Sequence, residues 1–582
     1  MKNGALKVLN RGGGIRTSLA LALVTSGLAG GLAARADDDA DLGPGHLLLS
    51  KVVYNASPSS VVKGVTQLPP NCTTGCVTAI ADGTYPTVFN NDTVDGSFGI
   101  TTKIVLDQLT RSGHVISSIE VPNSSQHGVG PNTDQMVSSF SSKSELALNL
   151  STDRRYVTFM GYLAPIGAID VSNSNTPAVV DPTNPVPGTD FRVVAKLDQH
   201  GHFHFIKTNA YSGNNGRAAI LNGQNGAGLI YTAGNAGNGG NPQPNGIIVG
   251  GGAQIMTASN LPLNSQPDPG IPTPVGSFNI TQVPPNTKTD KIGKDTNFRG
   301  LTIFNNVVYY TKGSGGNGIN TVYFVDTSGS DANGNPLQCP HGSGLPNPSA
   351  SLPASPIIYN AANLQTKGVF PYNMCILNGF TTVLAKSTTD SFPFGVWFAN
   401  ANTLYVADEG NGDNTFNSTT QTYSTAAAQT KAGLQKWVFD STLGAWKLAY
   451  VLQAGLDLGV PYTIPGYPTG LNTALKTPLP WSPATDGLRN LTGRVNRDGT
   501  VTVWAVTSTV SGSGDQGADP NKLVSISDNL AATTLPAGES FTTVKTARFG
   551  EALRGVSFTP GTGVRCAERG DSDDACEDDD DR

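Results

Sequence analysis

The amino-acid sequence predicts an all-β fold, a β-propeller with six blades, from three observations. The chain has 582 residues, too many for one compact core unless the fold grows by repetition. It contains 69 glycines and 38 prolines and only 14% charged residues, where about 25% is usual. Short segments rich in β-branched and aromatic residues recur between turn residues, which is typical of strands.

The recurring segments share a repeated motif, in which a hydrophobic residue, an arginine and a small residue begin an apolar strand. Four copies keep the arginine: Asn214–Leu221, Asn297–Phe304, Gly487–Val495 and Ala552–Phe558. Two copies lack it: Glu145–Leu150 and Phe394–Phe398. Six such strands predict six blades. A degenerate seventh blade would lie in residues 360–392 or 455–487, and an array of β-sandwiches is the alternative fold.

Further strands follow each copy of the motif. The expected second strands are Arg155–Tyr162, Gly228–Ala233, Val307–Lys312, Thr403–Ala407 and Val501–Val506. The expected third strands are Thr321–Asp326, Leu434–Asp440 and Lys522–Ser527, and the expected fourth strands are Lys447–Leu452 and Phe541–Thr546. Four strands per copy is the number found in a propeller blade.

The two ends of the chain predict how the ring closes. The last copy of the motif, around Arg554, is followed by almost no strand sequence. Near the other end, His46–Tyr54 has the character of a second strand without a first, and Ile104–Leu109 and His114–Val121 follow as third and fourth. We therefore expect the two ends to complete one blade together, which leaves no exposed sheet edge.

The N-terminal residues predict export. Residues 1–36 combine a positive head, the apolar segment Ser18–Ala34 and a small-x-small cleavage site, as a signal peptide does. A membrane anchor is the alternative, but the segment is short and rich in glycine and alanine. We expect an acidic linker at 37–45, the propeller at 46–565 and an acidic disordered tail at 566–582. The mature protein would be secreted or periplasmic and soluble, with no membrane span.

The charge distribution excludes one class of partner. The formal net charge is −6, and the acidic residues concentrate at Asp37–Asp41 and in residues 566–582. The body between these two segments is therefore close to neutral. A protein that binds nucleic acid through its surface needs a basic patch, so we expect no nucleic-acid partner.

The chain has six cysteines, an even number that suits an oxidising compartment. Sequence proximity suggests the disulfides Cys72–Cys76, Cys339–Cys375 and Cys566–Cys576, out of 15 connectivities that six cysteines allow. A zinc site is the alternative, but no histidine or further cysteine stands at the required spacing beside Cys72 and Cys76.

Four segments resemble a family of exported bacterial proteins that are themselves predicted propellers of uncharacterised activity. The matching segments are His46–Val53, Ser144–Tyr162, Asn209–Ala218 and Leu553–Pro560. Many members of that family end in a sorting helix, whereas this chain ends in a cysteine and a run of acids. The resemblance implies the fold and export and carries no activity.

The arginines of the motif are candidate ligand-binding residues. The start of the innermost strand in each blade lies near the central channel, so Arg217, Arg299, Arg489 and Arg554 would gather at its mouth. Guanidinium groups bind carboxylate, sulfate or phosphate through paired hydrogen bonds. The alternative is structural, with each arginine paired to a polar residue nearby or in the next blade.

Aromatic residues of the segment 461–487 are expected on the same face. Tyr462, Tyr467 and Trp481 could stack on sugar rings, or they could pack down as a lid over the joint between blades.

One acidic turn is a candidate metal site. Asp408 and Asp413 stand in a turn with several hard oxygen ligands, which suits calcium, although the EF-hand spacing is missing. Turns collect such residues without any metal, so we expect no cofactor, and calcium at this turn is the alternative. His200, His202 and His204 alternate along one expected strand, and they would bind zinc or copper or decorate the surface.

The sequence therefore predicts a secreted binding or surface-interaction module that uses the channel-mouth face. Its partner would be a carbohydrate, an anionic small molecule or another surface protein. The alternative is an extracellular hydrolase or lyase that acts on a polysaccharide or lactone, with or without calcium. No catalytic residue can be assigned, because no nucleophile motif is present and carboxylate pairs need geometry.

Overall fold

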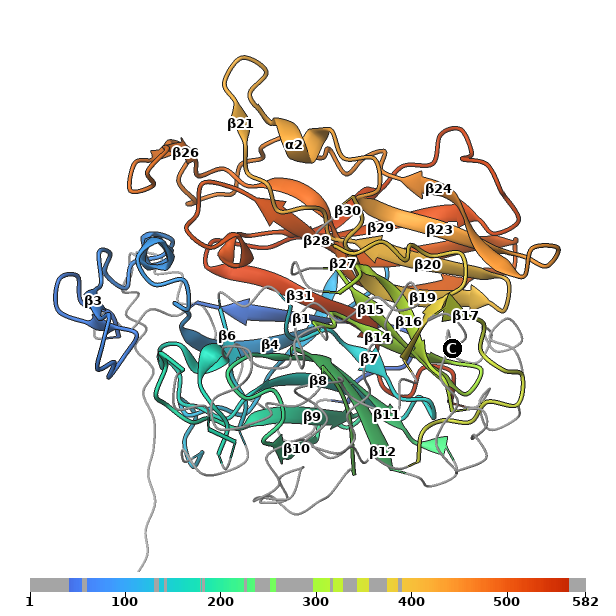
Figure 1. Ribbon diagram of the computed structural model, residues 1–582, viewed down its shortest axis with the longest axis horizontal. Helices are drawn as coiled ribbons and strands as arrows, with labels where there is room; N and C mark the ends of the chain where they lie inside the picture. The colour runs from blue at the N-terminus through green and yellow to red at the C-terminus, as the bar shows by residue number, and fades with distance from the viewer. Residues whose placement is uncertain are drawn as a thin grey trace, which may run out of the picture. The chain divides into compact units, whose positions relative to one another are not determined.

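A computed structural model gives the fold of the chain. The structure describes residues 41–54, 60–129, 135–140, 144–177, 179–180, 184–224, 228–235, 252–257, 297–313, 318–327, 343–354, 374–385 and 390–564. Strands dominate these residues, and they assemble into six main, mostly antiparallel sheets, the blades of a β-propeller (Figure 1).

Of the first three blades, blade one alone combines strands from both ends of the described chain. Blade one has the order β31 (Glu551–Phe558), β1 (Leu47–Val53), β4 (Thr101–Leu109) and β5 (Val115–Glu120). Blade two has the order β7 (Asn149–Leu150), β8 (Tyr156–Tyr162), β9 (Arg192–Asp198) and β10 (Phe203–Thr208). Blade three has the order β11 (Gly216–Asn222), β12 (Leu229–Gly234) and β13 (Ala253–Thr257).

The other three blades follow in chain order. Blade four has the order β14 (Leu301–Phe304), β15 (Val307–Lys312), β16 (Thr321–Val325), β18 (Met374–Leu377) and β17 (Ser343–Gly344). Blade five has the order β19 (Pro393–Asn400), β20 (Thr403–Asp408), β23 (Gly433–Asp440) and β24 (Ala445–Leu452). Blade six has the order β27 (Ala484–Val495), β28 (Thr500–Val510), β29 (Lys522–Asn529) and β30 (Thr542–Thr546).

The first strands of the six blades form a closed ring. In the order β7, β11, β14, β19, β27 and β31, each strand contacts the next, and β31 contacts β7. The small residue after the motif arginine allows this approach. A β-carbon at Gly555 would lie 2.3 Å from the carbonyl oxygen of Leu146, and one at Gly300 would lie 2.4 Å from that of Phe394. The six copies of the motif thus define the wall of the central channel.

Blade one closes the ring, as the sequence predicts. Strand β1, drawn in blue, pairs antiparallel with β31, drawn in red, and joins Leu48 to Ser557 and Leu49 to Val556 (Figure 1). The other edge of β1 pairs with β4. Because β1 and β31 come from opposite ends of the described chain, their pairing removes two free sheet edges.

The described strands contain no seventh blade. Within 360–392, the described part supplies β18, the fourth strand of blade four. Within 455–487, the chain forms only a hairpin of β25 (Leu471–Asn472) with β26 (Leu479–Pro480) before β27 begins. The six-bladed prediction is confirmed, and the β-sandwich alternative does not hold.

Neighbouring blades pack face to face through apolar side chains. Between blades five and six, Leu434 and Tyr405 meet Val503 and Ile526, and all four are buried. Such interdigitation between twisted sheets excludes water and supplies the main stabilising free energy.

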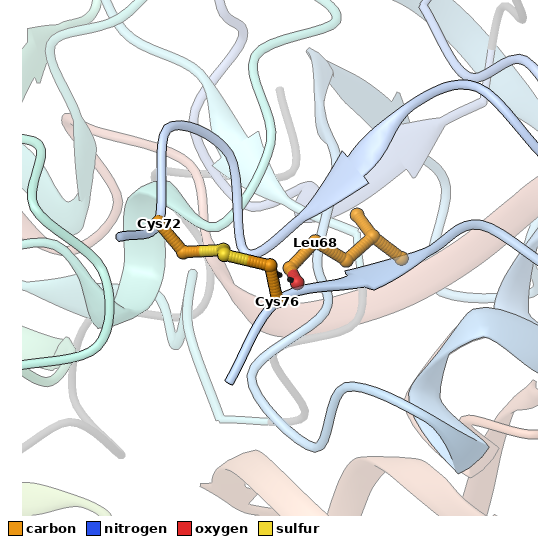
Figure 2. The surroundings of a disulfide bond; sticks show 3 residues. All are labelled: Leu68, Cys72 and Cys76. Atoms are coloured by element: carbon orange, nitrogen blue, oxygen red, sulfur yellow. Dashed lines mark hydrogen bonds between the residues drawn. A yellow bond between two sulfur atoms is a disulfide. The ribbon is translucent and has the colours of Figure 1, made fainter. Parts of the chain in front are cut away.

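A segment between β1 and β4 lies outside the blades. It contains β2 (Gln67–Leu68), β3 (Val77–Thr78) and the 3₁₀ helix η1 (Thr87–Thr93). The disulfide Cys72–Cys76, which the sequence predicts, closes the loop between β2 and β3, next to Leu68 (Figure 2). Cys375 is also disulfide-bonded, while Cys339, Cys566 and Cys576 lie outside the described residues.

Among the described residues, no helix has both the length and the apolar character that a membrane crossing requires. The expected signal peptide, acidic linker up to Ala40 and acidic tail fall outside the described residues.

Candidate ligand-binding site at the central channel

The motif arginines meet at one end of the channel. The two carboxylate oxygens of Glu409, which follows β20 in blade five, join arginines of the two adjoining blades. The Nε of Arg299 lies 3.2 Å from Oε1, and the Nε of Arg489 lies 3.4 Å from Oε2. Glu409 therefore bridges blades four and six.

The other two arginines bind backbone and side-chain oxygens of neighbouring segments. Arg217 donates to the carbonyl oxygen of Phe298 at 2.8 Å and to the side chain of Asn297. Arg554 donates to the carbonyl oxygen of Phe140. Burial, together with the nearby Arg489, lowers the pKa of Arg554 to about 10.

Several carboxylates compensate this buried positive charge. Burial lowers the pKa values of Arg217 and Arg554, and Glu145 offsets part of this lowering for both, as Asp515 does for Arg554. Arg489 in turn favours the charged form of Asp486, whose pKa burial raises to about 6. We call Arg217, Arg299, Arg489 and Arg554 together the arginine cluster. Its pairing between blades gives it a structural role, and direct binding of a ligand by these arginines stays a prediction.

The three aromatic residues of the segment 461–487 pack against the protein. The hydroxyl of Tyr462 donates to the carbonyl oxygen of Pro520 at 2.9 Å, and Lys522 Nζ lies 4.0 Å from the ring centroid. Tyr467 donates to Asp519 at 2.8 Å, and its ring meets that of Trp481 edge-on at 6.4 Å. Tyr467 and Trp481 are buried. Stacking of a sugar on these rings stays a prediction.

The two aspartates of the expected calcium turn lie in different environments. Asp408 is fully buried, and its carboxylate accepts bonds from Phe392 N at 2.7 Å and Gln435 Nε2 at 3.0 Å. Burial raises the pKa of Asp408 to about 7. Asp413 accepts from Thr415, whose hydroxyl lowers the pKa of this aspartate. Calcium at these two residues stays a prediction.

The three histidines do not alternate along one strand, so that expectation is wrong. Strand β9 ends at Asp198 and β10 begins at Phe203, which places His200 and His202 in the turn between them. The cause is Asp198, whose Oδ1 accepts the backbone N–H groups of both histidines at 2.9 and 3.0 Å. Only His204 lies in a strand. Within the described residues, no group of three or more metal-binding side chains gathers.

A cavity of about 670 Å³ lies at the other end of the channel. The motif arginines stand before or early in the innermost strands, whereas the cavity is lined by the residues that follow them. The lining strand residues are Leu148–Leu150, Ile220, Thr302–Phe304, Val396–Ala399, Leu491–Arg494 and Ser557–Phe558. Every blade therefore contributes its innermost strand to this cavity.

The charges on the cavity wall are all positive among the described residues. Arg111, Arg154 and Arg494 line it, and no described lining residue is an aspartate, glutamate or histidine. A concave surface with charges of one sign focuses the electrostatic field and raises the local concentration of counter-ions. The wall is therefore suited to an anionic ligand.

The arginines are held by the ends of the chain and by turns. Arg111 donates through Nε to the carbonyl oxygen of Gly45 at 3.2 Å. Arg154 lies against Gly563, where a β-carbon would stand 2.5 Å from its Nη1 and where φ is +68°. Only glycine combines that backbone conformation with so close an approach. The residues after β31 thus position one of the three cations.

Aromatic rings complete the wall. Trp397 lies on Gly493, where an added β-carbon would be 2.7 Å from the ring. Phe304 and Phe398 stack with their centroids 4.5 Å apart, and Phe558 also lines the cavity. Flat apolar faces beside guanidinium and amide groups can bind a sugar ring with an acidic substituent.

The sequence analysis missed this cavity, although the motif contains a signal for it. Three copies of the motif end in phenylalanine, at Phe304, Phe398 and Phe558, and all three side chains line the cavity. Arg111 and Arg154 lie in turns outside the repeated motif, so no local sequence pattern identifies them as residues of the cavity wall.

Comparisons with known proteins complete the description. No family model matches the chain. No curated protein sequence matches it. Among solved structures, it is similar to a polysaccharide lyase of family PL25, an ulvan lyase, bound to a saccharide. Identity is 11%, the match covers 92% of this chain and 99% of that one, and the TM-score is 0.28. The ulvan lyase without saccharide gives 10% identity, 90% and 98% coverage, and a TM-score of 0.28. The propeller assignment comes from the strand pairing.

Proposed function

We propose that this protein is an extracellular binding module that takes an anionic saccharide, or an anionic molecule of similar size, into the cavity. One observation carries the proposal, which is that three arginines and no described carboxylate line a cavity formed by all six blades. Its volume of about 670 Å³ falls in the range of small-molecule sites.

Each part of the wall has a task in this proposal. Arg154 and Arg494 bind the acidic group, because guanidinium groups pair with carboxylate or sulfate oxygens in a fixed geometry. Trp397 supplies a ring face for the apolar side of a sugar. Asn149 and Asn305 offer amide groups to hydroxyls.

The proposal takes binding as the role of this cavity and keeps the hydrolase or lyase as the alternative. Hydrolysis or elimination on a saccharide needs a group that gives or takes a proton within hydrogen-bond reach of the ligand. The described lining residues include no histidine, carboxylic acid, lysine or tyrosine. The hydrolase or lyase alternative therefore lacks a proton-transfer group in this part of the chain.

Isothermal titration calorimetry tests the proposal with two matched ligands, a trisaccharide of uronic acids and the same trisaccharide with its carboxyl groups methyl-esterified. The acid should bind and the ester should bind at least tenfold more weakly. A charged hydrogen bond contributes about 1.5–3 kcal/mol, so Arg154→Ala and Arg494→Ala should each weaken binding of the acid tenfold or more.

The chain offers a matched control next to Arg154. Arg155 is exposed and does not line the cavity. Arg155→Ala should bind the acidic trisaccharide as the unchanged protein does. Equal binding of acid and ester, or equal loss of affinity in the Arg154 and Arg155 variants, would contradict the proposal. Release of unsaturated or shortened product from the acid would favour the lyase or hydrolase instead.

A further inference from the structure

A lysine of blade five and an aspartate of blade six meet in the apolar joint between the two sheets. Lys436 lies in β23 and Asp528 in β29, and Lys436 Nζ is 2.9 Å from Asp528 Oδ2. Both side chains are fully buried. The same joint holds the buried apolar side chains of Leu434 and Ile526. The ion pair therefore lies in a part of the protein that excludes water.

Two tyrosines of blade five hold this pair in place. Tyr405 of β20 and Tyr450 of β24 stand directly opposite Lys436 in the strand pairing, one on each side. The hydroxyl of Tyr450 donates to Asp528 Oδ1 at 2.7 Å, and that of Tyr405 donates to Asp528 Oδ2. Lys436 Nζ donates to the carbonyl oxygen of Asn529 at 2.6 Å and to the hydroxyl of Tyr450 at 2.9 Å. These bonds fix the amine against the carboxyl group.

A second carboxyl group lies beside the pair. The backbone N–H of Asn529, the residue after Asp528, donates to Glu539 Oε1 at 3.0 Å. Glu539 Oε2 is buried and accepts no hydrogen bond from any described donor. When one of the two acids carries a proton, it donates to the other. Burial, together with the neighbouring Asp528, raises the pKa of Glu539 to about 7, so this group exchanges a proton near neutral pH.

The three side chains are the groups that amide formation requires. Charges are costly to bury, and Lys436 and Asp528 lose theirs when one proton passes from the ammonium to the carboxylate. The amine and the carboxylic acid that result are the two reactants of an amide bond. Because the fold holds them in contact, the reaction needs no encounter, and such positioning is equivalent to a concentration of about 10⁵–10⁸ M.

We propose that Lys436 Nζ and Asp528 Cγ form an isopeptide bond that joins blades five and six covalently. The amine attacks the carbonyl carbon of the protonated Asp528, and the hydroxyls of Tyr405 and Tyr450 stabilise the negative charge that develops on the oxygens. Glu539 takes a proton from the nitrogen and gives it to the departing hydroxyl. A C–N bond forms, a C–O bond breaks and one water molecule leaves, so the step requires no further reagent.

Peptide mass spectrometry of the whole protein, reduced, alkylated and digested, tests the proposal. The unchanged protein should yield one branched peptide that joins the segments around Lys436 and Asp528 and is lighter than their sum by one water molecule. Lys447 and Asp440 provide an internal control, because they form an ion pair of 2.7 Å in the same blade but are 57% and 27% exposed. Their peptides should stay unlinked.

Two variants test the roles of the groups. Glu539→Gln removes the proton carrier and keeps both reacting groups, and Lys436→Arg keeps the charge but removes the amine. Both should yield the two separate peptides in place of the branched one, whereas Lys447→Ala should retain the branched peptide. Because a covalent link restricts the unfolded chain, as a disulfide does, Glu539→Gln should also unfold at a lower Tm than Lys447→Ala.

Three outcomes would overturn the proposal. One is recovery of the Lys436 and Asp528 peptides as separate species from the unchanged protein, a result that needs no variant to fold. Another is equal linkage of Lys447 with Asp440, since the reaction would then not depend on burial. The third is an undiminished branched peptide in Glu539→Gln, which would remove the proton carrier from the mechanism.

Discussion

Leu49 in β1 pairs directly with Val556 in β31, and this pair joins the two ends of the described chain in one blade. Both side chains are fully buried. In a ring of blades this pairing completes the one blade that both ends of the described chain share, so the stability of the whole ring depends on it.

Weakening the closing blade should therefore destabilise the protein. Leu48→Ala removes a fully buried side chain from β1, and the cavity it leaves should cost about 2–5 kcal/mol in the free energy of unfolding. Denaturant unfolding followed by circular dichroism measures this change. Leu535→Ala, at a position 56% exposed, should change it by less than about 0.5 kcal/mol. Equal effects of the two variants would contradict closure through β1.

Glu409 should be essential for folding, because it is the carboxylate that Arg299 and Arg489 share. Glu409→Gln leaves two buried guanidinium groups without their carboxylate, and breaking such a pair costs about 3–5 kcal/mol. Glu120→Gln is the control, since Glu120 pairs with Lys103 where both side chains are about one-quarter exposed, and it should cost less than about 1 kcal/mol. Normal stability of Glu409→Gln would favour a direct ligand role for the arginine cluster.

The stability of the protein should fall as pH rises from about 4 to about 7. Burial raises the pKa of Asp519 from 3.8 to about 7, so the folded protein keeps a proton that the unfolded chain has released in this range. Stability decreases with pH wherever the folded state binds more protons. Calorimetric Tm values from pH 5 to pH 8 should decline less steeply in Asp519→Asn. Parallel curves for the two proteins would show that Asp519 does not titrate in this way.

Ligand in the cavity should change the fluorescence of Trp397. The indole ring lines the cavity, whereas Trp481 and Trp504 are buried elsewhere. We expect a saturable change of emission when the uronic-acid trisaccharide is added, and Trp397→Phe should abolish most of it. An unchanged response in Trp397→Phe would place the ligand away from this wall.

The repeated motif made the architecture predictable. Its pattern fixes the innermost strand of each blade, because the arginine must reach a neighbouring blade and the small residue, such as Gly555, must let adjacent backbones touch. The blade formed by both ends of the chain was predictable because the first strand around Arg554 has no further strands after it in the sequence. These signals are local sequence patterns, so they can be recognised without the structure.

The candidate site was less predictable, because it depends on which residues of distant strands share a cavity. The arginines of the motif were predicted to bind a ligand because they recur. Their recurrence instead reflects pairing between blades, as the ion pair of Arg299 with Glu409 illustrates. Arg154 and Arg111 occur once each in turns. Only the closed ring brings them to the same cavity. The turn at His200 was also not predictable from the alternation of histidines. The side chain of Asp198 accepts the backbone N–H of His200, and this bond forms a turn where the sequence analysis expected a strand.

A crystal structure of the protein with the uronic-acid trisaccharide bound tests the central claim most directly. We expect the acidic group within hydrogen-bond distance of Arg154 or Arg494, and a sugar ring against Trp397. A saccharide bound instead at Arg217 and Arg299, or over Tyr462 and Tyr467, would contradict the assignment of the cavity as the binding site.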